Sequence, residues 1–168
     1  MKVGDSKNRD SLTGVATERA LMGFAAAALE AVIPRGPPVC FIQIDVDGLA
    51  AIQEEFGSAV GDAVLLGVAD CLNEGIRGHD LVGRSADGFG ICMPELTPAQ
   101  GRAAAQRLRF RVLSNPVATA RGALNVTCSI GIANSTDLEA GVEALVGRAR
   151  EARRDAQSEG GDRVIAAW

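Results

Sequence analysis

The chain has 168 residues, a length that suits one compact domain. Hydrophobic residues make up 47% of it and charged residues 23%, which supports a sizeable core and argues against disorder. The net charge is −4, and no block of Lys or Arg marks a nucleic-acid footprint. With five Phe, one Trp and no Tyr, the chain also has few aromatic platforms for stacking single-stranded bases, so nucleic acid is not an expected partner.

The cysteines predict a reduced compartment and no zinc site. They are widely spaced, lie in apolar stretches, and form no CxxC or Cys/His pair: Cys40, Cys71, Cys92 and Cys128. We interpret them as buried, reduced thiols in a cytoplasmic domain. No apolar run is long enough to span a membrane and residues 1–7 lack a signal-peptide core, so membrane insertion of this segment is not expected.

The first part of the chain predicts a flexible start, a helix and a buried strand. Residues 1–9 are polar and are expected to be flexible, while residues 10–168 are expected to form a single domain. A helix is predicted over residues 17–32, and the Pro and Gly residues of 34–38 stop it. The mostly apolar run 39–44 predicts a central buried strand.

The middle of the chain predicts two helices and a hairpin. A short helix is expected over residues 48–56 and a longer one over 59–76, whose apolar positions recur every four residues at Val60, Val64, Val68 and Leu72. Residues 80–86 and 89–93 are predicted to pair as strands. Asp87-Gly88 between them is a strong signal for a type I′ turn.

The last part predicts two more helices and two strands. An Arg- and Ala-rich helix is expected over residues 98–113, a core strand over 123–133, a helix over 137–158 and a short strand over 163–167. The whole order of elements predicts an α+β sandwich with helices over a mixed, mostly antiparallel sheet.

Several separated motifs resemble those of one family in order and in spacing. They are DSLTGVATER (10–19), DVD (45–47) with Gly57 and Gly61-Asp62, RSADGF (84–89), SIGIA (129–133), and AQ through GGD (156–162). Over about residues 10–165 this pattern is similar to the GGDEF family, the diguanylate cyclases. The resemblance implies the palm-like α+β fold shared with nucleotide cyclases.

The resemblance also implies a nucleotide site with missing groups. Active family members work like two-metal enzymes, in which carboxylates hold Mg²⁺ and cations hold the triphosphate of GTP. In this chain Asp45 stands at the metal position, and Gln53 and Asp62 stand where the guanine is bound. The cations and the His of the motifs are replaced by Ala50, Ser58, Gln157 and Gly161.

The hairpin can be aligned with the GGDEF motif in two ways. Counting back from Phe89 keeps Asp87 as a metal-binding acid and puts Gly88 at the catalytic Glu. Counting forward from Arg84 puts Gly88 at the metal position and loses both acids. The loop is shorter in either alignment and the Glu is absent. Loss of one acid/base group costs roughly 10²–10⁴ in rate, and each lost phosphate clamp adds to it, so we expect no cyclase, no catalytic residues, no cofactor and no bound metal.

A second motif predicts a ligand. Arg77-Gly-His-Asp80 resembles the family's RxxD inhibitory-site motif, which binds the product cyclic di-GMP, and Arg107 matches a further Arg that grips the ligand. Arg can bind a phosphate or the O6/N7 edge of guanine bidentately, and Asp can accept from guanine N–H groups. The structural alternative is a surface Arg–Asp pair at a turn, which contributes little energy.

Three hypotheses follow. The first is a binding module that senses cyclic di-GMP through Arg77, Asp80 and Arg107, and that signals to a protein partner or by self-association. The second is an interaction scaffold that needs no nucleotide and uses a dimer face or the helix carrying residues 102–111. The third is an enzyme or a GTP sensor with residual metal–nucleotide binding through Asp45, Asp62 and Asp87.

Overall fold

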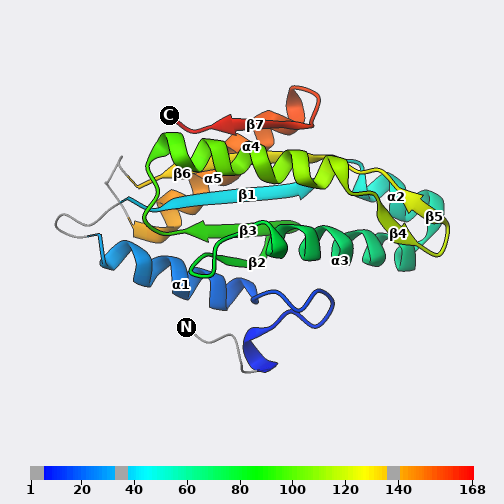
Figure 1. Ribbon diagram of the computed structural model, residues 1–168, viewed down its shortest axis with the longest axis horizontal. Helices are drawn as coiled ribbons and strands as arrows, with labels where there is room; N and C mark the ends of the chain where they lie inside the picture. The colour runs from blue at the N-terminus through cyan, green and yellow to red at the C-terminus, as the bar shows by residue number, and fades with distance from the viewer. Residues whose placement is uncertain (1–5, 33–37, 136–140) are drawn as a thin grey trace.

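A five-stranded sheet forms the centre of the molecule (Figure 1). The computed structural model describes residues 6–32, 38–135 and 141–168. The strand order is β2-β3-β1-β6-β7, and every neighbouring pair is antiparallel except β6 with β7. The strands are β1 (Cys40–Val46), β2 (Leu81–Ser85), β3 (Gly88–Met93), β6 (Cys128–Asn134) and β7 (Arg163–Ala166).

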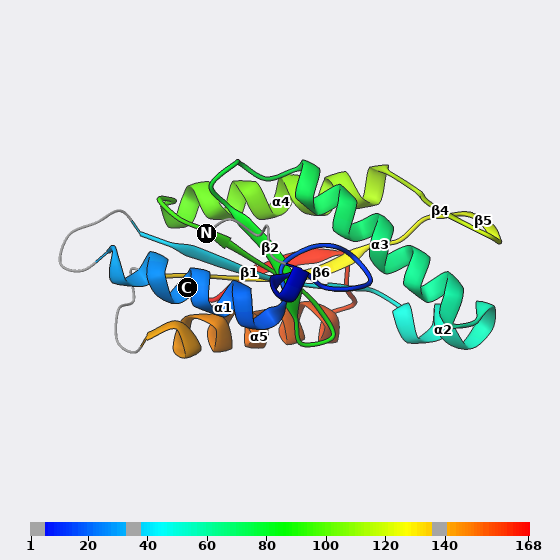
Figure 2. The same cartoon turned by 90° about the horizontal axis from the view of Figure 1, so that it is seen from below.

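Helices cover both faces of this sheet (Figure 2). One face carries α1 (Glu18–Glu30) and α5 (Gly141–Ser158), and the other carries α3 (Ser58–Glu74) and α4 (Pro98–Ser114). A short helix, α2 (Leu49–Phe56), follows β1 and packs on α3. A small separate ribbon consists of β4 (Val117–Thr119) and β5 (Gly122–Leu124). The layers are those of the predicted α+β fold.

The alternation of side chains along β1 decides which residues meet which helices. Ile42 and Ile44 belong to the core cluster that includes α3 and α4, whereas Phe41 belongs to the cluster that includes α1 and α5. Because successive side chains of a strand point to opposite faces, Gln43 and Asp45 lie on the same face as Phe41. The polar end of the central strand is therefore directed toward α5.

The structure confirms most of the predicted elements and corrects two of them. The hairpin loop is Ala86-Asp87 and not Asp87-Gly88, since Ser85 pairs with Gly88. Only the first loop residue, Ala86, has a positive φ (51°), whereas a type I′ turn needs two. The strand predicted over 123–133 was wrong as one element, because it divides into β5 and β6, and β4 was not predicted. Residues 137–140 of the last helix lie outside the described residues.

The start of the described chain is folded against the rest. Residues Ser6–Asn8 form a 3-10 turn, and the Asn8 carbonyl accepts a hydrogen bond from the Thr17 amide. Thr17 then caps α1 by accepting from the Ala20 amide. No helix in the described ranges is long and apolar enough to cross a membrane.

The cysteines are unpaired thiols. Cys40, Cys92 and Cys128 are buried and Cys71 is partly buried. Burial raises the pKa of Cys40 to about 11 and that of Cys92 to about 12, so these thiols stay protonated and unreactive at neutral pH.

Gly131 allows α5 to lie close to the sheet. A Cβ atom at this position of β6 would collide with the backbone of Ala149 and Arg153 on α5. We expect Gly131→Ala to lower the free energy of unfolding by about 1–3 kcal/mol or more, because neither backbone can yield cheaply. Urea denaturation measures this change. Gly147→Ala, on α5 but facing open space, is the control and should raise stability by about 0.5–1 kcal/mol; equal behaviour of the two variants would contradict the close packing.

Candidate functional site

One hollow collects most of the residues that the motifs predicted for a nucleotide site. Its volume is about 490 Å³. We call it the Asp45 pocket, and it is lined by Asp45, Val46, Gly48, Leu49, Ala50, Gln53, Leu65, Arg84, Asp87 and Gln157. Asp45, Gln53 and Asp87 are thus brought together from β1, α2 and the hairpin. Asp62 is exposed on α3 and is not part of the lining that the described residues form.

Asp45 is paired with an arginine that the sequence analysis did not single out. The Arg153 Nη1 lies 3.0 Å from Asp45 Oδ2, and the two side chains are only 13% and 12% exposed. The same Nη1 donates to Gln157 Oε1 at 2.6 Å. Burial raises the pKa of Asp45 above its ordinary value, while Arg153 and a hydrogen bond from Gln43 act in the opposite direction.

The sequence carried a signal for this pair. Arg153 lies within the apolar face of α5, one residue after buried Ala152 and three before buried Ala156. Gln43 interrupts an otherwise apolar stretch of β1 and is fully buried. A charge on the buried face of a helix and an amide in a central strand both require partners, but neither pattern says that the two lie together.

A second arginine of α5 holds the hairpin. The Arg150 Nη2 donates to Glu18 Oε1 at 2.7 Å and to Ser85 Oγ at 3.0 Å. From the central strand, Gln43 Nε2 donates to the Ser85 carbonyl at 3.0 Å. Ser85, the last residue of β2, is therefore fixed from two sides, and the turn after it has a defined position.

The hairpin lies so close to β1 that position 88 has no room for a side chain. A Cβ atom on Gly88 would collide with the Ile44 carbonyl and with the Asp45 carboxylate. Gly88 is the residue that one alignment puts at the catalytic Glu. The short, two-residue loop brings the backbone of residue 88 against Asp45, and only glycine fits at that position.

Asp47, the second acid of the DVD motif, has a structural role. Its carboxylate accepts hydrogen bonds from Thr127 Oγ1 at 2.7 Å, Ser129 Oγ at 2.6 Å and the Asp162 amide at 2.9 Å. Gly161 has a φ of +74°, and a Cβ there would lie 2.9 Å from Asp47 Oδ2. The turn before β7 thus needs glycine at the position where the family motif has an arginine.

These residues do not fit the divalent cation that the family motifs imply. Asp45 faces a guanidinium, Gly88 offers no ligand, and Asp47 is occupied by three donors, which leaves Asp87 as the remaining acid of the pocket lining. Within the described ranges no group of three or more His, Cys, Asp or Glu side chains could hold a metal ion. Mg²⁺ prefers several oxygen ligands in near-octahedral geometry, which this set does not supply.

The Arg77–Asp80 turn is the second candidate site. The Asp80 carboxylate accepts from the Arg77 backbone amide at 2.9 Å and from Arg77 Nη2 at 2.6 Å, and Nε lies 3.1 Å from both oxygens. The Asp80 side chain is 1% exposed and that of Arg77 is 35% exposed. His79, between them in the turn, is exposed.

Arg107 reaches the same turn from α4. It is exposed, and its Nη2 lies 3.4 Å from the carbonyl of Gly75, two residues before Arg77. The three predicted ligand-binding residues therefore come from one region. This region lies at the Cys40 end of β1, since Leu81 and Phe41 both pair with Cys92, and the Asp45 pocket lies at the other end.

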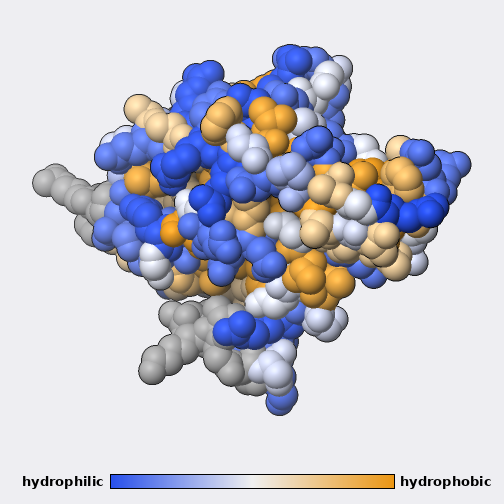
Figure 3. Space-filling view, turned by 45° about the vertical axis from the view of Figure 1, so that its right-hand side comes forward, coloured by the Kyte–Doolittle hydropathy of each residue, from blue (hydrophilic) through white to orange (hydrophobic). Residues whose placement is uncertain are grey.

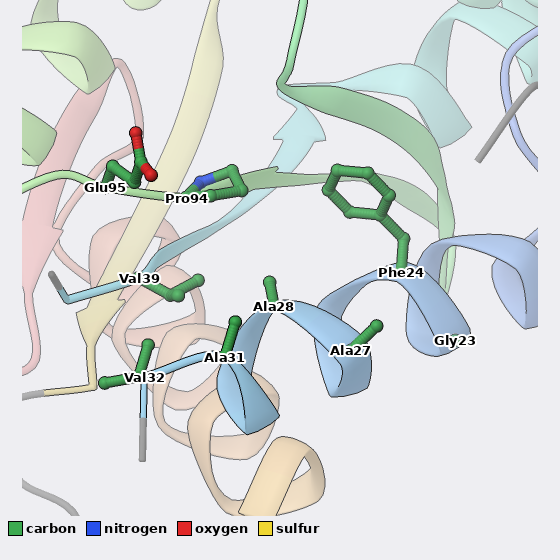
Figure 4. A pocket seen from close by; sticks show the side chains of 9 residues that line it. All are labelled: Gly23, Phe24, Ala27, Ala28, Ala31, Val32, Val39, Pro94 and Glu95. Atoms are coloured by element: carbon green, nitrogen blue, oxygen red, sulfur yellow. The ribbon is translucent and has the colours of Figure 1, made fainter. Parts of the chain in front are cut away.

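An apolar hollow adjoins the Arg77–Asp80 turn (Figure 4). Its volume is about 390 Å³, and Arg77 Nη2 donates at 2.7 Å to the carbonyl of Pro94, which lines it. The close-up shows Phe24 and Pro94 across the hollow from the small side chains of α1, with the Glu95 carboxylate turned away. The lining consists of Gly23, Phe24, Ala27, Ala28, Ala31, Val32, Val39, Pro94 and Glu95.

Apolar side chains elsewhere on the surface are scattered. The face in Figure 3 has several separate apolar patches among hydrophilic atoms. The most exposed large hydrophobic residue described is Phe110 of α4, at 63%. Single exposed apolar residues are common, so this observation alone does not define an interface.

Comparison with known proteins identifies the family to which this domain belongs. Residues 7–163 match the family described as "Diguanylate cyclase, GGDEF domain". The chain therefore belongs to the GGDEF domain family.

Two curated relatives are much longer than the chain. "Response regulator PleD" of Caulobacter vibrioides is 33% identical over 159 residues, which are 93% of this chain and 35% of that protein. "Diguanylate cyclase DgcP" of Pseudomonas aeruginosa is 31% identical over 160 residues, 92% of this chain and 23% of that protein. The chain thus spans about a third or less of the length of these relatives.

Solved structures confirm the palm-like fold. The GGDEF domain of DgcB from Caulobacter crescentus, solved in complex with c-di-GMP, has a TM-score of 0.89 and 21% identity, covering 97% of this chain and 94% of that one. The FimX GGDEF domain from Pseudomonas aeruginosa has a TM-score of 0.87 and 24% identity, with 95% and 98% covered. Diguanylate cyclase SiaD from the same organism, in complex with its activator SiaC, has a TM-score of 0.84 and 27% identity, with 94% and 61% covered.

Proposed function

We propose that this GGDEF domain is a receptor for cyclic di-GMP that binds through Arg77, Asp80 and Arg107 and does not synthesise the ligand. The observation that carries the proposal is the Arg77–Asp80 turn. The Asp80 side chain is only 1% exposed, and its carboxylate orients the guanidinium of Arg77, whose side chain is 35% exposed. The exposed part of this guanidinium is available to a ligand.

The chemistry of the turn suits a guanine nucleotide with phosphates. Arg77 can bind a phosphate oxygen or the O6/N7 edge of guanine, and Arg107 adds a second cation from the neighbouring helix. Asp80 can accept from guanine N–H groups only after Arg77 has moved, because Arg77 now bonds both of its oxygens. Binding would therefore exchange an internal ion pair for contacts with the ligand, and release the Pro94 carbonyl beside the apolar hollow.

The Asp45 pocket supports the absence of synthesis. Three positions at which the family motifs carry phosphate-binding cations are Ala50, Gln157 and Gly161 in this chain. Gly88 leaves the catalytic carboxylate position without a side chain. Each missing charge-stabilising group costs about 10²–10³ in rate, so the combined loss leaves no useful activity.

Calorimetric titration with cyclic di-GMP tests the binding, and Arg107→Ala is the informative variant. Arg107 is exposed and its replacement should leave the fold intact, while removing a charged hydrogen bond worth about 1.5–3 kcal/mol. We expect the dissociation constant to rise roughly tenfold to a hundredfold. Arg102→Ala removes the same charge from an exposed position of α4 and should leave affinity unchanged. An equal loss of affinity in both variants would mean that binding depends only on the net charge of the domain and not on Arg107 itself.

The scaffold is the second candidate, because Phe110 is 63% exposed on the helix that carries residues 102–111. A protein partner or self-association is expected in either case. GTP sensing is less well supported, since the ion pair with Arg153 occupies Asp45. A cytoplasmic location stays a prediction from the unpaired cysteines.

A further inference from the structure

We propose that Arg153 supplies the cation of the Asp45 pocket, and that its guanidinium takes the place of a divalent metal ion beside Asp45. The pocket would then be neutralised by a part of the chain itself and closed to Mg²⁺ and Mn²⁺. This inference concerns the opposite end of β1 from the Arg77–Asp80 turn, so it holds or fails independently of cyclic di-GMP binding.

The position of Arg153 is fixed by the fold. Its backbone amide lies against Gly131 of β6, where no Cβ atom fits, so α5 packs closely on the sheet at this residue. At the end of its side chain, Nη1 lies 3.0 Å from Asp45 Oδ2 and donates to Gln157 Oε1 at 2.6 Å. The guanidinium is thus held by α5 on one side and by the end of β1 on the other.

The hydrogen bonds of Arg153 indicate that its charge, more than its hydrogen bonding, keeps it beside Asp45. Its Nε is buried and has no hydrogen-bond partner among the described residues. Burying a guanidinium with an unpaired Nε costs free energy, and a neighbouring carboxylate offsets part of that cost. Asp45 is that carboxylate: both side chains are nearly nine-tenths buried, and Asp47 and Asp87 add negative charge nearby.

A divalent cation could not share Asp45 with this guanidinium. Two cations at one carboxylate repel each other strongly where water is largely excluded. The missing side chain of Gly88 removes the ligand that would otherwise offset this repulsion. The Arg153 side chain would have to leave the pocket first, and its ion pair with Asp45 and its hydrogen bond to Gln157 oppose that movement.

Paramagnetic broadening by Mn²⁺ alone tests the inference. In an amide NMR spectrum of the wild-type domain we expect no saturable broadening at Gln43, Ser85 or Gly88, which surround Asp45. Arg153→Met keeps a side chain of similar length without charge, and saturable broadening should appear at these amides. Asp45→Asn in the Arg153→Met background should abolish it. Arg154→Met, one residue along α5 and exposed, removes the same charge and should behave as the wild type.

Each outcome of these titrations either supports the inference or overturns it. Saturable broadening in the wild type that disappears in Asp45→Asn would overturn the inference, as would a folded Arg153→Met variant that binds Mn²⁺ no better than the wild type. If Arg153→Met does not fold, the double variant with Asp45→Asn decides. Folding regained in the double variant supports charge neutralisation by Arg153, whereas a double variant that also fails to fold contradicts it. Cyclic di-GMP is absent throughout, so none of these results bears on the receptor function.

Discussion

Replacing Arg77 by alanine is expected to abolish cyclic di-GMP binding and to lower the free energy of unfolding by about 1–3 kcal/mol. The second effect follows because Asp80, whose side chain is 1% exposed, would keep the backbone amide of residue 77 as a donor but lose the guanidinium. The Pro94 carbonyl would lose a donor at the same time. Calorimetry with the ligand and urea denaturation without it measure the two effects separately.

A double variant distinguishes loss of the ligand contact from loss of the fold. Asp80→Asn in the Arg77→Ala background removes the uncompensated charge and should recover part of the lost stability. It should not recover binding, since both groups that contact the ligand are changed. Recovery of binding together with stability would show that Arg77 and Asp80 only close the turn.

Introducing the missing carboxylate by Gly88→Glu is expected to produce no cyclase activity. The new side chain would collide with the Ile44 carbonyl and the Asp45 carboxylate, and would add negative charge beside Asp45. We expect the free energy of unfolding to fall by about 1–3 kcal/mol or more. Chromatography of the products of a GTP and Mg²⁺ incubation checks the activity, and urea denaturation checks the stability.

Ala86→Glu is the matched control for this substitution. It adds the same charge in the same hairpin, but at an exposed position of the turn, so stability should change little. Cyclic di-GMP synthesis by Gly88→Glu would contradict this prediction, because it would mean that a carboxylate at position 88 is enough for catalysis.

The fold could be read from the sequence because its signals are local. Apolar positions at every fourth residue marked α3, and Pro and Gly marked the end of α1. The hairpin turn was predicted one residue too late because Asp-Gly is a favourable turn pair. Pairing of Ser85 with Gly88 overrides that preference, since the strand register depends on packing against β1.

The Asp45 pocket could be predicted only in part. Motif spacing predicted Asp45, Gln53 and Asp87 for one nucleotide site, and these three residues line one hollow, on β1, on α2 and in the hairpin loop. Asp62 was expected with them but points to solvent from α3. Arg153 was missed since it is more than one hundred residues from Asp45 in sequence, and only the crossing of α5 over β1 brings them together.

The Arg77–Asp80 turn, too, could be predicted only in part. Only two residues lie between the pair in sequence, so a contact between them was an obvious expectation. The near-complete burial of Asp80 was not, because it depends on how the rest of the chain packs around the turn. Burial changes the interpretation from a weak surface ion pair to an oriented guanidinium with a large penalty for its removal.

Calorimetric titration of the wild-type domain with cyclic di-GMP, in the presence of a metal chelator, tests the central claim most directly. The account predicts binding at micromolar concentrations or tighter without any divalent ion, since Arg77 and Arg107 supply the positive charge. Absence of heat at high ligand concentration, with the domain folded and free of copurified ligand, would contradict the receptor function and favour the scaffold.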